Sequence, residues 1–192
     1  MAKIKYTFPE LYCPGCQYHQ TVGDAVVRTR YCNGFPKRRK PKRFKRSDPK
    51  YKPPKWCPRR ISPPVCRIYG FADRDSELMH WMLNNDDVCS CERTARISVN
   101  EHHYRLRLEV SLGMTAKQFY DATQSEPLSD IFSNCGAQVE RCEIIEIDDG
   151  LKPYYFYCLD GFAVVPLAFF DRSRVKPKPA EPAPSAKGGE QG

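Results

Sequence analysis

The sequence predicts an α+β protein, in which a small cysteine-rich N-terminal module precedes an antiparallel sheet carrying two or three short helices. Three observations lead to this prediction. Well-spaced cysteines bracket a long basic run in the first third of the chain, alternating apolar residues mark later strands, and helix-forming segments separate them. At 192 residues, the chain is long enough for one hydrophobic core and a smaller satellite. We therefore expect a module at residues 1–66, an α+β body at 67–171 and a disordered, Pro- and Ala-rich tail at 172–192.

Two cysteines near the N-terminus have the spacing of metal ligands. Cys13-Pro-Gly-Cys16 places two thiols three positions apart, and its glycine permits a tight turn that points backbone amides at the sulfur atoms. The β-prone residues 25–31 would return Cys32 to this pair, and Cys57 follows the basic run. No strand-then-helix context of the thioredoxin type surrounds the pair, which disfavours a redox role.

Four thiolates suit tetrahedral Zn²⁺, and a closed site would supply folding energy to a segment with little apolar content. The predicted zinc ligands are Cys13, Cys16, Cys32 and Cys57. Cys66 is the main alternative for the fourth position, and His19 is a weaker one.

The Cys-Pro-Gly-Cys segment resembles the zinc knuckle of zinc-ribbon modules, which commonly reads Cys-Pro-x-Cys. The resemblance extends over residues 1–66 and implies a small zinc-ribbon-like module with a long basic loop. In place of a second Cys-x-x-Cys, this chain has the separated cysteines Cys32 and Cys57.

Charge is distributed unevenly along the chain. Residues 1–60 contain 17 Lys and Arg against 3 Asp and Glu, whereas residues 61–192 contain 14 against 20. Residues 36–60 hold 13 of these basic residues, a single acid and six prolines, which exclude a long helix or a central strand. We therefore expect an extended basic loop.

This loop has the composition of a nucleic-acid contact, because its cations neutralise phosphates and the interleaved Phe44, Tyr51 and Trp56 would stack on unpaired bases. A solvated tail or a localisation signal is the alternative. The predicted contact residues are Lys37, Arg38, Arg39, Lys40, Lys42, Arg43, Phe44, Lys45, Arg46, Lys50, Lys52, Lys55, Arg59 and Arg60.

The body shows clear secondary-structure patterns. Residues 103–112 alternate strictly and predict a strand with Tyr104, Leu106, Leu108, Val110 and Leu112 inward. A short helix capped near Asp73 or Asp75 is expected, with Leu78, Trp81 and Met82 on one face. Further predicted elements are a helix capped by Thr115 and Gln118, a short helix at 127–136, and strands at 139–147, 154–159 and 162–170. Pro166 requires the last strand to lie at a sheet edge or to contain a bulge.

Support for an enzyme is weak. The chain has no Gly-rich phosphate loop and no Gly-x-Ser-x-Gly elbow, and Asp148, Asp149 and Asp160 fall in expected turns. We interpret Cys89-Ser-Cys91 as a turn with incidental or packed thiols. Two alternatives stay open: a second metal site formed with Cys66 or Cys135, and catalysis by one of the pair with a distant histidine. Cys142 and Cys158 are expected to pack as small core residues.

These features predict a zinc-stabilised, non-enzymatic nucleic-acid-binding protein, with DNA and RNA not separated. Such a chain would suit a bacterial mobile-element or phage accessory protein, although no motif points to one. The alternative is a protein-interaction or inhibitor module whose basic loop occupies an acidic or nucleic-acid-binding surface of a partner, with the acidic body as a second protein surface. No secretory signal and no apolar run of about 20 residues is visible, so we expect a cytoplasmic protein with reduced cysteines and no membrane contact.

Overall fold

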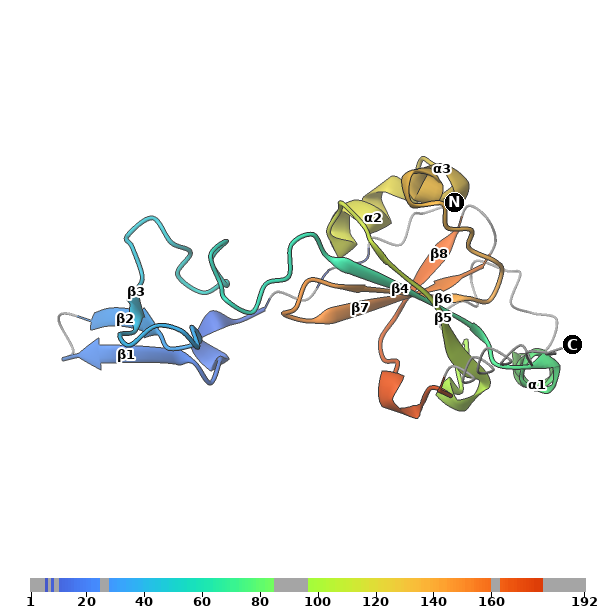
Figure 1. Cartoon of the computed structure of the whole chain (residues 1–192), viewed down its shortest axis with the longest axis horizontal. Helices are drawn as coiled ribbons and strands as arrows, with labels where there is room; N and C mark the ends of the chain where they lie inside the picture. The colour runs from blue at the N-terminus through green and yellow to red at the C-terminus, as the bar shows by residue number, and fades with distance from the viewer. Residues whose placement is uncertain are drawn as a thin grey trace, which may run out of the picture.

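The protein forms two lobes, which lie side by side in Figure 1. The computed structural model describes residues 6, 8, 11–24, 28–84, 97–159 and 163–177. One lobe is an N-terminal module around a three-stranded sheet, and the other is a larger body around a five-stranded sheet. The mixed α+β class predicted from the sequence is confirmed.

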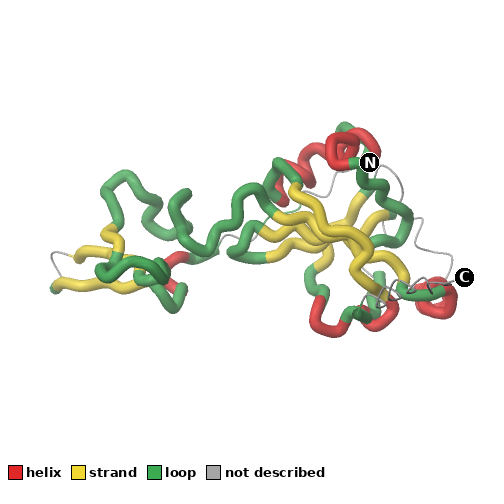
Figure 2. The backbone as a smooth tube through the Cα atoms, viewed as in Figure 1, coloured by secondary structure: helices red, strands yellow, loops and turns green. Residues whose placement is uncertain are grey.

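The N-terminal module contains more loop than strand, as Figure 2 shows. A 3₁₀ turn, η1 (Cys13–Gly15), leads into the antiparallel strands β1 (His19–Gly23) and β2 (Arg28–Cys32). A two-residue strand, β3 (Lys42–Arg43), pairs with the end of β2 and forms the sheet edge. The prolines of the basic run restrict regular structure to this short edge pairing, so the expected extended loop is confirmed around β3.

The body sheet is antiparallel throughout, in the order β5-β4-β6-β7-β8. Its strands are β4 (Val65–Phe71), β5 (Tyr104–Ser111), β6 (Ile144–Asp148), β7 (Pro153–Cys158) and β8 (Val164–Leu167). The last three form the expected meander. Pro166 lies in the edge strand β8, where its missing N–H leaves no ladder bond unmade.

Helices cover both faces of this sheet (Figure 1). The helices α2 (Ala116–Ala122) and α3 (Leu128–Phe132) pack on one face with the core around Phe119, Ile145 and Phe156. On the other side lie α1 (Arg74–Asn84) and the short turns η4 (Glu101–His103) and η6 (Arg172–Arg174). The predicted capping box of α2 is present, and Gly136 ends the α3–η5 segment (η5, Ser133–Cys135) at a φ of 62°.

A β-bulge overturns one prediction for β5. Ile68 pairs with Leu108 while Tyr69 pairs with Leu106, which leaves Arg107 as an extra residue. Such an insertion reverses the side of the sheet that later residues face. Leu108 therefore packs against the cluster under α2 and α3, whereas Leu106 packs in the cluster of the opposite face. The single inward row predicted for residues 104–112 is wrong.

The inward face predicted for α1 is wrong at two of its three residues, since only Trp81 packs against the core cluster on this side of the sheet. Leu78 and Met82 are exposed, whereas His80 is almost completely buried. His80 takes the inward position because its Nε2 lies 2.8 Å from the hydroxyl of Tyr157 and its ring stacks on that tyrosine. This partner lies in a distant strand, which residue periodicity does not reveal.

The two predicted domain boundaries, after residues 66 and 171, differ from the division that the structure shows. Cys66 belongs to β4, so the body begins at Val65. Tyr6 and Phe8 pack on Tyr120 of the body rather than on the module. The predicted tail is ordered through its first residues, because η6 and Lys176 contact the body, and Lys176 Nζ lies 2.8 Å from an oxygen of Asp73.

Several predictions lie outside the described residues: most of the strand at 3–8, the Cys89 and Cys91 pair, Asp160 and the tail from residue 178. In the described part of the chain, no helix has the length and apolar character needed to cross a membrane.

Candidate metal centre and nucleic-acid interface

The four predicted zinc ligands converge on one small cavity. Cys13 and Cys16 come from η1, Cys32 from the end of β2 and Cys57 from the loop before the body. All four line a cavity of about 20 Å³, which has room for one water-sized occupant. Segments far apart in the sequence thus bring their thiols to the same place.

Tight backbone turns present these thiols. The Cys16 amide donates to the Cys13 carbonyl at 2.9 Å, and the Cys57 amide donates to the Pro54 carbonyl at 3.0 Å. At Cys32, the backbone N–H of Gly34 donates to the sulfur and favours its thiolate form. The sequence predicts such amide-to-sulfur bonds for the zinc knuckle at Cys13 and Cys16. The structure has this bond at Cys32.

The thiols influence one another electrostatically. Burial raises the pKa of the Cys13 thiol, and the neighbouring thiols of Cys16, Cys57 and Cys32 raise it further. Burial likewise raises the pKa of Cys32 against the opposing effect of the Gly34 amide. Four thiolates in this volume need a compensating cation. As they stand, no three His, Cys, Asp or Glu side chains in the described ranges are arranged to hold a metal ion.

The two alternatives for the fourth ligand have different outcomes. Cys66 is fully buried in the apolar core of the body, where desolvation raises its pKa to about 12, so it does not belong to the cavity. His19 does line the cavity, and its buried Nε2 has no hydrogen-bond partner among the residues that the structure describes. Burial, followed by the charge of Arg30, lowers the pKa of His19. A neutral imidazole nitrogen is a suitable zinc donor.

Aromatic rings surround the cavity and connect it to the basic loop. Phe44 is buried with Cys13 and Cys32, and Trp56 packs edge-on against it with ring centroids 5.0 Å apart. The ammonium of Lys42 lies 4.0 Å from the Trp56 centroid. The prediction that Phe44 stacks on a base is therefore wrong, because only 8% of its surface is exposed.

Asp48, the only acid in residues 36–60, orders the loop. Its carboxylate accepts the Lys45 amide at 2.7 Å and the Trp56 indole N–H at 2.9 Å. Partial burial acts to raise the pKa of Asp48, yet these hydrogen bonds and nearby lysines hold it below its ordinary value. The loop is thus tied to the aromatic cluster, which disfavours the alternative of a merely solvated tail.

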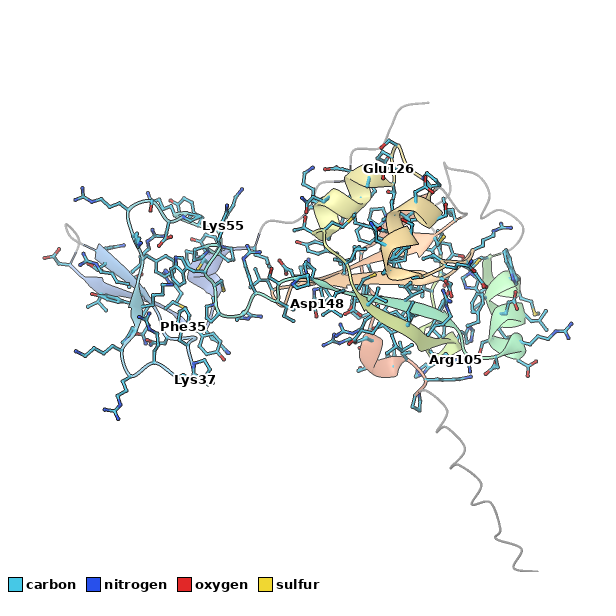
Figure 3. All side chains as sticks on the ribbon, turned by 45° about the horizontal axis from the view of Figure 1, so that its top comes forward. Phe35, Lys37, Lys55, Arg105, Glu126 and Asp148 are labelled. Atoms are coloured by element: carbon cyan, nitrogen blue, oxygen red, sulfur yellow. The ribbon has the colours of Figure 1, made fainter. Side chains whose placement is uncertain are left out.

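Most of the predicted contact residues are exposed on the module. Figure 3 shows Lys37 and Lys55 on opposite sides of it, with Phe35 between them. Lys42 is half-buried over Trp56. The exposed basic residues are Lys37, Arg38, Arg39, Lys40, Arg43, Lys45, Arg46, Lys50, Lys52, Lys55, Arg59 and Arg60.

Arg60 belongs to the joint between the two lobes. Its guanidinium lies 3.1 Å from the Asp149 carboxylate, and the Asp149 carbonyl accepts the Ile61 amide at 2.7 Å. Gly150, with a φ of 79°, faces the carbonyl of Arg59 so closely that a Cβ would overlap it. Arg60 therefore also serves the joint between the lobes, and its contact with nucleic acid stays a prediction.

Two exposed tyrosines complete the interface. The rings of Tyr12 and Tyr51 stack with centroids 5.9 Å apart and planes 17° apart. Tyr51 was identified from its place in the basic run, but Tyr12 was missed. In the sequence, only the position of Tyr12 directly before Cys13 indicates that it lies near the candidate site. The stacking of the two rings becomes visible in the tertiary structure.

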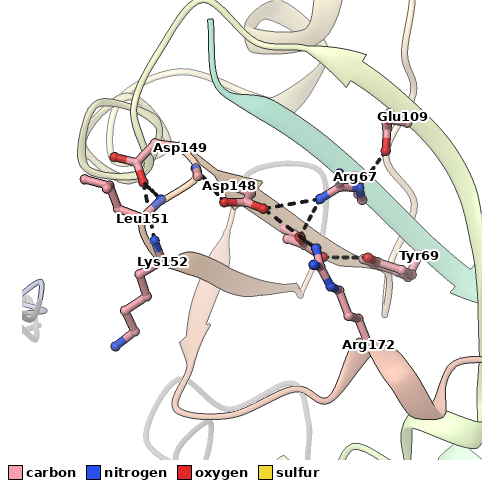
Figure 4. A network of polar contacts seen from close by, with 10 residues as sticks. Arg67, Tyr69, Glu109, Asp148, Asp149, Leu151, Lys152 and Arg172 are labelled. Atoms are coloured by element: carbon pink, nitrogen blue, oxygen red, sulfur yellow. Dashed lines mark hydrogen bonds and ion pairs between the residues drawn. The ribbon is translucent and has the colours of Figure 1, made fainter. Parts of the chain in front are cut away.

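The body contains a separate polar network, drawn in Figure 4. The buried carboxylate of Glu146 accepts from Arg67 at 2.7 Å and Arg172 at 3.2 Å through one oxygen, and from the Tyr69 hydroxyl at 2.5 Å through the other. Each oxygen of this carboxylate is therefore engaged within the fold. At the hairpin nearby, Asp148 and Asp149 accept backbone amides, which confirms their predicted turn roles.

Comparison of the chain with protein-family models, with curated proteins and with solved structures gives no match.

Proposed function

We propose that this protein is a zinc-stabilised nucleic-acid-binding protein without catalytic activity, whose N-terminal module contacts the phosphate backbone. One observation carries the proposal. Four cysteines from three segments of the chain line one cavity, and the loops that connect these segments bear exposed Lys and Arg side chains. The metal would fix the loops, and the loops would bind the polyanion.

The donor set supports zinc in this cavity. Thiolate sulfur and neutral imidazole are the ligands that Zn²⁺ prefers, and Cys13, Cys16, Cys32 and Cys57 are the residues that would hold it. The sulfurs would turn inward as the ion binds and the thiols release their protons. The unpartnered Nε2 of His19 makes this histidine the reserve donor.

The charge of the module supports nucleic acid as its partner. Residues 36–60 carry 13 Lys and Arg against one Asp, and that Asp is hydrogen-bonded to N–H groups of the loop. Each phosphate that such a surface neutralises releases counterions, so the logarithm of the binding constant falls by about 0.9 per contact for each tenfold rise in salt. The held loop also loses less entropy on binding than a free tail would.

A titration of the full chain with duplex DNA at two salt concentrations tests the proposal. We expect binding that weakens steeply with salt and that a Lys37→Ala/Lys40→Ala variant weakens further, with a smaller salt slope. The control, Lys117→Ala/Lys152→Ala, removes the same charge from the body and should bind like the unmodified protein. Absence of binding at low salt would overturn the proposal. Salt-resistant binding of one protein partner would favour the interaction module instead.

A further inference from the structure

We propose that Tyr12 and Tyr51 form a stacking platform for unpaired nucleotide bases, so that the protein prefers single-stranded over duplex nucleic acid. This inference rests on the proposed function and adds the form of nucleic acid that is bound. The two rings are 60% and 53% exposed, although both carry large apolar surfaces. Their nearly parallel planes present an extended aromatic surface to solvent.

The backbone is held in place at Tyr51 and at the two residues before it. The Tyr51 carbonyl accepts the Cys13 amide at 2.6 Å, directly at the proposed zinc site. Arg30 donates to the carbonyls of Pro49 at 2.9 Å and Lys50 at 2.7 Å. Since Tyr12 precedes Cys13, the same cysteine positions both rings. A fixed platform binds a base with little loss of side-chain entropy.

The surroundings of the platform favour a nucleotide over other aromatic or apolar ligands. The ammonium of Lys50 lies 5.4 Å from the Tyr51 centroid, and Arg46 is exposed nearby in the sequence. Each nucleotide combines a flat π surface with a phosphate, and base–aromatic stacking contributes about 1–3 kcal/mol per base. Bases in a duplex are already stacked on one another, so only unpaired bases gain from the platform.

The test compares a mixed-sequence strand of about 20 nucleotides, longer than a typical single-strand site, as DNA, as RNA and as the DNA duplex. We expect Tyr12→Ala/Tyr51→Ala to weaken single-strand binding about tenfold or more. Duplex affinity and the salt slope should not change. Tyr12→Phe/Tyr51→Phe keeps the rings and should bind like the unmodified protein. Phe169→Ala, which removes an exposed ring from the body, is the matched control.

The outcomes separate the two proposals. If the unmodified protein binds and the alanine variant has the same single-strand affinity, the platform is wrong and the proposed function stands. Equal weakening of single-strand and duplex binding would show that the tyrosines support the module's fold, which also overturns the platform. If the unmodified protein binds no nucleic acid, the proposed function itself fails.

Discussion

The body and the N-terminal module differ most in the apolar surface that each buries. The body buries two clusters of side chains, and large residues such as Phe119, Phe132 and Phe156 are wholly excluded from solvent. In the module, the buried cluster consists of Cys13, Cys32 and Phe44, with two partly buried aromatics beside it. Two of those three residues are proposed metal ligands.

This difference suggests that the lobes are stabilised by different means. A body with a sizeable core gains its stability from burial, at roughly 25 cal/mol per Å² of apolar surface. A segment of about fifty residues with so small a core needs a metal or another crosslink. The two lobes should therefore respond independently to metal removal and to core substitutions.

Metal removal should produce the largest difference between the lobes. We expect chelation, or Cys16→Ser, to unfold the module and leave the body intact, because only the module depends on the thiolates. Limited trypsin digestion measures this: the basic loop should be cut while a fragment beginning near Val65 survives. Cys135→Ser, in a half-buried thiol of the body, is the control. If the module still resisted trypsin after complete chelation, its fold would not depend on the metal, which would contradict this difference between the lobes.

A core substitution in the body should have the opposite pattern. Phe119→Ala removes a fully buried ring and should lower the free energy of unfolding by about 3–5 kcal/mol in urea titrations. Metal content should not change. The control Phe169→Ala, at an exposed ring, should stay within about 0.5 kcal/mol of the unmodified protein. Loss of metal together with body stability would mean that the two lobes fold as one unit.

The joint offers a smaller, local effect. Gly150→Ala places a Cβ against the Arg59 carbonyl in a left-handed conformation. It should destabilise the chain by more than the roughly 1–2 kcal/mol that the left-handed conformation alone costs. Proteolysis near residue 60 should increase while both lobes stay folded. Gly113→Ala is the matched control, because a Cβ there meets nothing within 4 Å. If the two substitutions destabilised the chain equally, the close contact between Gly150 and Arg59 would not stabilise the joint.

The body should also show a modest acid sensitivity that arises at His80. Burial, and then the charge of His103, lower the pKa of His80 from 6.5 to about 4. As the pH falls, the histidine of the unfolded chain binds a proton before the folded one does. The contribution of His80 to the free energy of unfolding is therefore complete above pH 6.5 and is lost as the pH falls toward 4. Hydrogen exchange of β6 and β7 amides across this range measures the loss. In His80→Gln this part of the pH dependence should disappear, and its persistence would assign it to another group.

Local chemistry explains which features the sequence could predict. The α2 capping box and the tight turn from Cys13 to Cys16 depend on neighbouring residues, and both were predicted correctly. For Pro166 the sequence left an edge or a bulge open, and the structure shows the edge. The bulge at Arg107 and the buried face of α1 depend on partners in other strands, so periodicity misassigned both. At the candidate site, convergence of the four cysteines was predicted. The burial of Phe44, the role of Arg60 and the Tyr12–Tyr51 pair required the tertiary structure.

Elemental analysis of the full chain, purified without added metal, tests the central claim most directly. We expect about one zinc ion per chain, as a four-ligand structural site requires. Replacement of Cys13 or Cys57 by serine should abolish it, whereas Cys135→Ser should retain it. Metal-free protein whose module still resists trypsin would contradict the account, because the small core of the module would then suffice to hold the basic loop.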